Sequence, residues 1–179
     1  MRKTLSILCI LLVGAALAGC ASKAEPPIDE DLMTLTWREF DQTMGGGWRA
    51  IADAGDHRLA ARTIEAYIER NLDTEPGKMA YMHFHCAVGW AFESEWDRSI
   101  AHLDQAFVEE FPEGFPSTWN QLVGATRGIL SEDMDAFEKA RSEMNEMTNL
   151  SPRDSMFVGS INELSGFTRE MYIEYMQGE

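Results

Sequence analysis

The chain has few cysteines and few basic residues, and both shortages limit the class of protein. Of its 3 cysteines, Cys9 and Cys20 lie in or at the end of an apolar N-terminal segment. Cys86 has no intramolecular disulfide partner, so the fold must rely on a hydrophobic core. The 179 residues include 15 lysines and arginines against 30 aspartates and glutamates. Such an acidic surface repels nucleic acid, and we expect no nucleic-acid partner.

Motifs of catalysis are missing as well. Neither Gly-x-Ser-x-Gly nor His-Glu-x-x-His occurs. The run at 45–47 is rich in glycine but lacks the Lys-Ser/Thr ending of a phosphate loop, and we interpret it as a break that lets Trp48 pack closely. Acidic residues at 93–97 and 132–135 lie at expected helix N-termini, where they stabilise the helix dipole. We nominate no catalytic residue and expect no cofactor and no enzymatic activity.

A metal site is the other candidate chemistry. His83 and Cys86 are three residues apart and share one face of a helix, whereas His85 lies on another. His102, on the expected partner helix, offers a third ligand of a kind that zinc accepts. The spacings match no zinc signature, and a lone buried cysteine usually behaves as a small hydrophobic residue. We therefore interpret Cys86 as a core residue and expect no metal.

The N-terminal segment indicates where in the cell the protein is located. Arg2 and Lys3 precede an apolar run over 5–18 that is too short to span a bilayer comfortably. Together with Leu17-Ala18-Gly19-Cys20, this segment resembles a bacterial lipoprotein signal peptide and its lipobox. The resemblance implies cleavage after residue 19 and a lipid on Cys20. An ordinary secretory signal, with Cys20 incidental, is the alternative.

The residues after Cys20 bear on the location and the domain boundaries. Ala21 and Ser22 resemble the sorting pattern for the outer membrane, so we expect a lipid-anchored protein that faces the periplasm. The following residues up to 31 are mostly polar, with two prolines and four acids, and this composition predicts a flexible tether. We expect a signal peptide over 1–19, a lipidated tether over 20–31 and one domain over 32–179.

The body of the chain has almost no period-two alternation. Apolar residues instead recur at spacings of three and four, which predicts helices. Candidate helical segments fall near 48–52, 59–68, 79–92, 100–107, 122–129 and 134–147. Ser151-Pro152-Arg153-Asp154 is typical of a helix start, because Ser151 can cap, Pro152 suits the first turn and Asp154 can complete a capping box. The fold class predicted is all-α, with helices in pairs.

The helix pairs also repeat. The stretch over 87–100 resembles the hairpin of a tetratricopeptide repeat, with Trp90 at the aromatic position and Ser99 at the small-residue position. Equivalent small residues, Ala60, Ser99 and Ala136, lie 39 and 37 residues apart, against a consensus period of about 34. The match covers roughly residues 41–150. The same part of the sequence is similar to small bacterial tetratricopeptide-like proteins that have no assigned activity. The match implies a solenoid of about three repeats.

The C-terminal residues are expected to close this solenoid. Terminal repeats usually act as caps, and a single apolar stripe fits a capping helix. A dimerisation helix is the alternative. The stripe consists of Phe157, Ile161, Leu164, Met171 and Tyr175.

The resemblance implies that the first helices of successive hairpins line a groove that binds an extended peptide. The positions on that face are Arg49, Tyr81, Phe84, Val88, Thr118, Gln121 and Ala125. Exposed aromatic residues of this kind often anchor partners, and the acidic rim favours a basic one. We therefore expect a protein- or peptide-binding module. An envelope hydrolase that uses a carboxylate pair and a self-associating structural lipoprotein are the alternatives.

Overall fold

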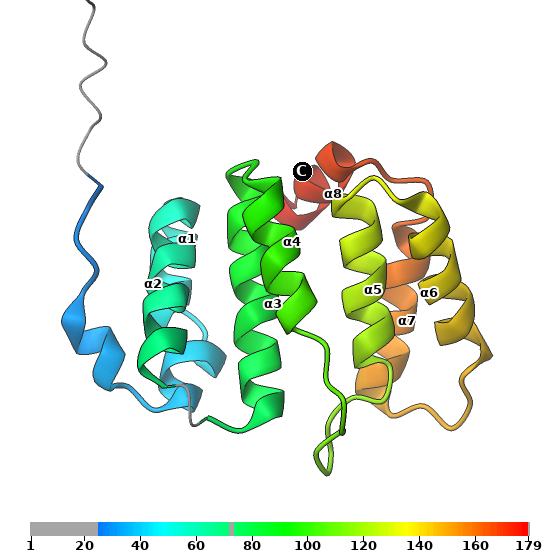
Figure 1. Ribbon diagram of the computed structural model, residues 1–179, viewed down its shortest axis with the longest axis horizontal. Helices are drawn as coiled ribbons and strands as arrows, with labels where there is room; N and C mark the ends of the chain where they lie inside the picture. The colour runs from blue at the N-terminus through cyan, green and yellow to red at the C-terminus, as the bar shows by residue number, and fades with distance from the viewer. Residues whose placement is uncertain (1–24, 72–73, 179) are drawn as a thin grey trace, which may run out of the picture.

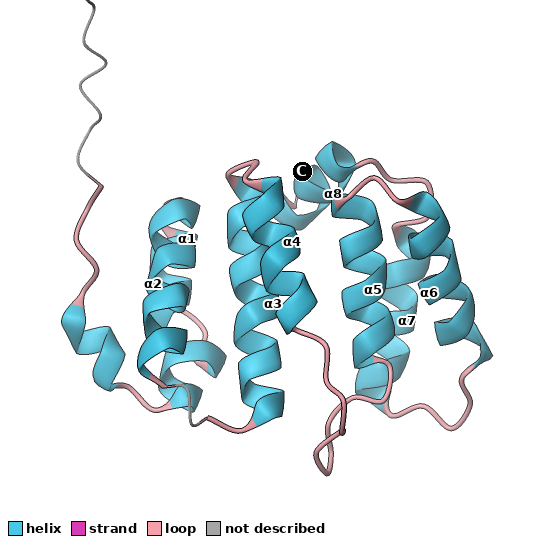
Figure 2. Ribbon diagram, in the orientation of Figure 1, coloured by secondary structure: helices cyan, strands magenta, loops and turns pink. Residues whose placement is uncertain are grey.

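The computed structural model describes residues 25–71 and 74–178, and these ranges contain eight α-helices and no strand. The all-α prediction is confirmed (Figure 2). In the described part of the chain, no helix combines the length and the apolar character that a bilayer crossing requires. The expected signal peptide over 1–19 and the expected lipidation site Cys20 lie outside the described residues.

The first six α-helices form three successive antiparallel pairs, which lie side by side along the molecule (Figure 1). A three-residue turn joins the members of each pair. The pairs are α1 (Gly47–Asp53) with α2 (His57–Arg70), α3 (Pro76–Phe92) with α4 (Trp96–Gln105), and α5 (Trp119–Leu130) with α6 (Met134–Glu146). Two further helices, α7 (Pro152–Glu163) and α8 (Arg169–Gln177), follow and are joined by five residues.

The three short turns share one backbone conformation. Their middle residues, Gly55, Ser94 and Glu132, have φ values of 87°, 57° and 58°. Asp56 and Asp133 follow the first and third of these residues, and each caps the next helix by accepting a backbone N–H three residues on. This is the geometry of a side-chain N-cap, which satisfies one of the unpaired donors at a helix start. An aspartate side-chain N-cap therefore starts both α2 and α6.

Two apolar clusters form the core, and α3 contributes to both. Its residues Met82, Cys86 and Trp90 are fully buried with Phe40 and Ile64 in the N-terminal cluster. On another face of α3, three alanines join the C-terminal cluster formed mainly by α5 and α6. A helix that is apolar all round has to be buried in this way. The prediction of a buried helix over 79–92 is confirmed, and Pro76 extends it by occupying the first turn rather than breaking the chain.

The C-terminal stripe does not form one helix. Gly166 adopts a φ of 81° between α7 and α8, and Thr168 caps α8 by accepting the Met171 N–H. Within the expected stripe, Ile161 is buried, whereas Met171 is 42% exposed. The expected single capping helix is therefore corrected to two helices. Helix α7 packs against α5 and α6, and α8 turns back toward α3 (Figure 1).

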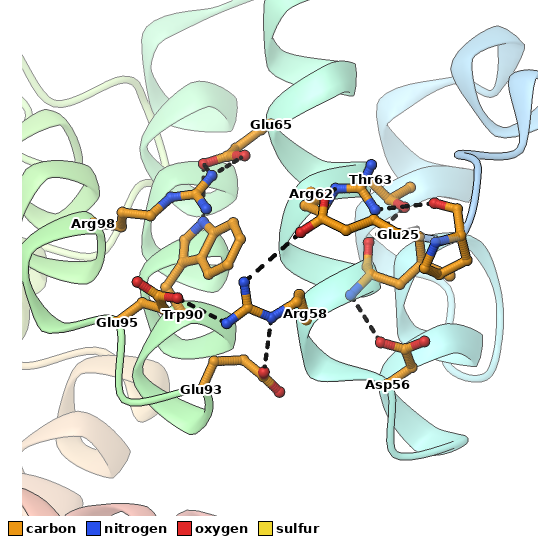
Figure 3. A network of polar contacts seen from close by, with 12 residues as sticks. Glu25, Asp56, Arg58, Arg62, Thr63, Glu65, Trp90, Glu93, Glu95 and Arg98 are labelled. Carbon is orange, nitrogen blue, oxygen red and sulfur yellow. Dashed lines mark hydrogen bonds and ion pairs between the residues drawn. The ribbon is translucent and has the colours of Figure 1, made fainter. Parts of the chain in front are cut away.

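The described part of the expected tether lies against α2. Glu25 forms ion pairs with Arg62 at 3.0 Å and with Arg58 at 3.9 Å, and Arg62 also donates to the Pro26 carbonyl (Figure 3). A short 3₁₀ helix, η1 (Glu30–Thr34), follows, and its Glu30 accepts from Arg70 at 2.9 Å. Residues 25–31 are thus held along the outer face of the first hairpin.

Candidate binding groove

Asp41 organises one end of the first hairpin. It lies in a π-helical turn, η2 (Arg38–Gln42), and its side chain is fully buried. Its carboxylate accepts the Trp48 Nε1–H at 3.0 Å and lies 2.7 Å from His85 Nδ1, while its backbone carbonyl accepts from Arg49 Nε at 2.8 Å. Burial by itself would raise the pKa of Asp41, but the attraction to His85 and these hydrogen bonds outweigh it and lower that pKa. Asp41 therefore fixes Trp48 and His85 through its buried carboxylate and Arg49 through its backbone carbonyl.

These side chains border a cavity of about 400 Å³ between α1, α2 and α3, which we call the α1–α3 cavity. Its walls are mostly apolar, and Met44, which is 81% exposed, and Met176 of α8, which is 42% exposed, stand at its edge. Methionine side chains are flexible and adapt to different ligands. The remaining lining residues are Trp48, Arg49, Ala52, Asp53, His57, Ala60, Ala61, Ile64, Phe84, His85, Val88, Gly89 and Phe92.

The polar groups of the cavity come from three helices. Arg49 lies on α1, and its guanidinium carbon sits 4.4 Å from the centre of the Trp48 ring. His57 opens α2 and stacks on Phe92 with ring centres 4.2 Å apart, while His85 lies on α3. An apolar pocket with a few convergent polar groups is the usual form of a ligand site. The arrangement can bind a small or extended ligand.

Three of the seven predicted groove residues line this cavity. They are Arg49, Phe84 and Val88. His85 also lines the cavity and shares a face of α3 with Val88, three residues later. Its helical spacing was the signal that could have identified it, whereas nothing local in the sequence links it to Asp41, 44 residues earlier.

The other four predicted residues lie elsewhere. Tyr81 is partly buried against Trp119, with ring centres 4.5 Å apart. Thr118 and Ala125 are fully buried in the C-terminal part of the molecule. Gln121 lines a separate cavity of about 500 Å³ between α5 and α6. The structure therefore does not bring the seven residues together into one continuous surface.

Cys86 is a buried core residue, as predicted, and the neighbouring histidines His83 and His102 belong to a polar network. His83 Nδ1 lies 3.0 Å from His102 Nδ1, and His102 Nε2 lies 3.1 Å from Glu65 Oε1. The same Glu65 oxygen accepts from Trp90 Nε1 and from Arg98, both at 2.9 Å. Figure 3 shows Arg98 over the Trp90 ring beside Glu65.

The side chains in this network that could bind a metal already have hydrogen-bond partners in the protein. Ligand atoms of Glu65, Cys86 and His102 lie within 4.8 Å of one another. However, Glu65 is already paired with protein donors, and the Cys86 sulfur donates to the Ala61 carbonyl at 3.5 Å. Burial also raises the pKa of the Cys86 thiol, which disfavours the thiolate that binds metals. We interpret the cluster as a closed polar network that joins α2, α3 and α4.

The network predicts a stability change with pH. His83 is 7% exposed, and its burial and the neighbouring His102 lower its pKa from 6.5 to about 4. Between these values the unfolded chain binds a proton that the folded chain does not, so the free energy of unfolding falls as pH decreases from 6.5 to 4. The difference corresponds to a loss of about 3 kcal/mol across this window. Urea unfolding at a series of pH values measures it.

His83→Gln is the matched control for this prediction. Glutamine stays neutral and its carbonyl can accept from His102, so the variant should lose most of the pH dependence between 6.5 and 4. Identical pH profiles for the variant and the wild type would contradict the assignment to His83.

The carboxylates of the α3–α4 turn are also paired. Arg58 of α2 donates to Glu93 at 3.1 Å and to Glu95 at 2.7 Å (Figure 3). One guanidinium therefore pairs with both carboxylates and occupies the space between them, where acid–base hydrolysis would need a substrate. This turn is therefore better suited to joining α2 to the α3–α4 hairpin than to catalysis.

No protein-family model matches the chain, and comparison with curated proteins and with solved structures finds no significant match.

Proposed function

We propose that the protein binds a segment of another protein in the α1–α3 cavity and that it acts without catalysis. The observation that carries this proposal is the cavity itself, because apolar walls, convergent polar groups and exposed methionines at the edge are together characteristic of a binding site. Its position between α1, α2 and α3 agrees with a groove formed by successive hairpins. The net charge of −15 favours a basic partner.

The helix pairs support a tetratricopeptide-like solenoid as the scaffold of this site. Three hairpins with the same three-residue turn follow one another, and small residues lie where helices approach closely. A Cβ at Gly89 would lie 3.1 Å from the Ala61 Cβ, and one at Gly124 would lie 3.6 Å from the Ala140 Cβ. Small residues at hairpin crossings are a feature of such repeats. In this proposal α7 and α8 close the C-terminal end.

Lipid anchoring is the second part of the proposal. The sequence at 17–20 supports a lipid on Cys20, which would hold the domain at the periplasmic face of the outer membrane. We expect Cys20→Ala to abolish incorporation of a labelled fatty acid and to release the protein from the membrane fraction. Ser22→Ala is the matched control and should change neither result. Unchanged labelling of the Cys20 variant would contradict the anchor.

Site-specific photo-crosslinking tests the groove in the full-length, membrane-bound protein. A photo-reactive phenylalanine analogue replaces Met44 at the edge of the cavity, and in a control it replaces Met156, which is 58% exposed on α7. We expect a defined adduct from position 44 and none of the same size from position 156. The adduct should disappear when Val88→Glu places a charge inside the cavity, whereas Ala50→Glu on the exposed face of α1 should leave it intact. Equal adducts from both positions, or none from position 44, would contradict the proposal.

A further inference from the structure

We infer that residues 25–30 form a clasp on α2, and that this clasp limits how far the domain can move away from the membrane. The inference rests on the lipid anchor of the proposed function and adds a restraint on where the partner is met. It depends on three observations: the ion pairs of the clasp, its apolar contact, and the short length of chain between Cys20 and Glu25.

The clasp consists first of ion pairs between two acids of the N-terminal segment and three arginines of α2. Glu25 lies 3.0 Å from Arg62 and 3.9 Å from Arg58, and Arg62 also donates to the next backbone carbonyl at 3.0 Å (Figure 3). Two turns further along α2, Arg70 donates to Glu30 at 2.9 Å. Charge-assisted hydrogen bonds of this kind are stronger than neutral ones. Contacts near both ends therefore fix the path of the segment along the outer face of α2.

An apolar contact lies between the two groups of ion pairs. Ile28 is partly buried and packs against the N-terminal cluster, and it lines the same surface depression as Ala66 of α2. Surface ion pairs are individually weak and are screened by salt, so the apolar contact adds a component that salt does not weaken. Met33, which is 8% exposed, belongs to the cluster itself. The clasp can therefore open without removing the buried residues that follow it.

The length of chain before the clasp limits the position of the domain. Cys20, the expected lipidation site, lies five residues before Glu25. Five residues span at most about 18 Å when they are fully extended. If the clasp opens, the first buried residue is Met33, thirteen residues after Cys20, and the greatest span rises to about 47 Å. The clasp therefore more than halves the distance that the domain can reach from the bilayer.

The clasp also determines which end of the molecule lies near the membrane. Glu25 contacts Arg58 in the first turn of α2, and Arg58 joins this point to Glu93 and Glu95 in the α3–α4 turn. The end of the molecule that carries these turns is therefore within reach of the anchor, whereas the loop between α4 and α5 lies at the opposite end (Figure 1). Because His57, at the start of α2, lines the α1–α3 cavity, a partner that enters this cavity must come close to the membrane surface.

Energy transfer from the full-length, lipidated protein to a membrane tests the inference. Because Cys86 is fully buried, a cysteine introduced by Asp97→Cys near the α3–α4 turn can be labelled with a donor dye. The protein is inserted into phosphatidylcholine vesicles that carry an acceptor dye on their headgroups. Glu25→Gln, Ile28→Ser and Glu30→Gln are combined to remove the side-chain contacts of the clasp. We expect the efficiency of energy transfer to fall at least twofold in this triple variant.

A second measurement detects the clasp without a membrane. Hydrogen exchange over residues 26–32, followed by mass spectrometry in detergent, should become at least fivefold faster in the triple variant. Asp31→Asn is the control for both measurements, because Asp31 is an exposed acid of the same segment that takes no part in the clasp. It should leave energy transfer and exchange as in the wild type. Thermal unfolding shows whether each variant keeps its fold.

The outcomes separate the clasp from the anchor on which it rests. Unchanged hydrogen exchange in the triple variant would show that residues 25–30 are not held on α2, and would overturn the inference while leaving the lipid anchor intact. Faster exchange with unchanged energy transfer would show that opening the clasp does not move the domain, and would overturn the restraint on distance. A wild-type protein that does not attach to the vesicles would overturn the anchor and the inference together.

Discussion

Gly128→Ala is expected to destabilise the protein by about 3 kcal/mol, because the new methyl group would collide with backbone atoms of the neighbouring helix. A Cβ at Gly128 would lie 2.7 Å from the Phe137 nitrogen and 3.0 Å from the Asp133 carbonyl oxygen. Backbone atoms cannot rotate away as a side chain can, so α5 and α6 would have to separate. The two helices form one hairpin and bury Ile129 and Phe137 between them. Thermal unfolding should show a midpoint lower by about 10 °C.

Gly159→Ala is the matched control for this prediction. Gly159 lies within α7, and a Cβ at that position would meet nothing within 4 Å. Because alanine has the higher helix propensity, this substitution should stabilise the protein by about 0.5–1 kcal/mol. The same chemical change is thus expected to have opposite signs at two helix-interior glycines. A midpoint for Gly128→Ala equal to that of the wild type would show that α5 and α6 do not approach as closely as described.

The elements that sequence reasoning predicted are those specified by short-range signals. Ser151 caps α7 by accepting the Asp154 N–H, and Pro152 occupies its first turn, as the local sequence predicted. The short turn at Gly55 likewise has a local signal, because glycine readily adopts the φ of 87° found there. A cap or a turn depends on a few consecutive residues, so it can be read without knowing the rest of the fold. Helix ends were less exact, because α4 ends at Gln105 and leaves Phe107, which was placed in the helical run, 43% exposed.

The candidate site could be predicted only in part, because it depends on contacts between distant segments. Arg49, Phe84 and Val88 were placed correctly beside one cavity by their helical register. Tyr81 was not, because the long connection from α4 brings Trp119 against its ring. The pairing of Asp41 with His85 joins residues 44 positions apart and has no sequence motif. Register shows which residues share a helix face, but not which other segment covers that face.

Asp154→Ala is expected to cost about 3 kcal/mol, a loss comparable to that of Gly128→Ala, for an electrostatic reason. The Asp154 side chain is 4% exposed and joins the N-terminal ends of two helices. It accepts the Thr118 backbone N–H at 2.9 Å and the Thr118 hydroxyl at 2.8 Å at the start of α5, and it accepts the Ser151 hydroxyl at 2.6 Å at the start of α7. Alanine would leave the two buried donors of Thr118 without an acceptor. Chemical denaturation should therefore show a lower midpoint.

The pH dependence distinguishes this carboxylate from a packing contact. Burial by itself would raise the pKa of Asp154, but the hydrogen bonds from Ser151 and Thr118 outweigh it and lower that pKa below 3.8. Because the unfolded chain takes up the proton first, the stabilisation is present above about pH 4 and is lost as pH falls through the lowered pKa. Asp154→Ala should lack this acid-sensitive component, which lies below the pH window assigned to His83. Asp133→Ala, which removes an exposed cap of α6, should cost only about 1 kcal/mol. Equal losses for the two substitutions would show that Asp154 is an ordinary helix cap and does not tie α5 to α7.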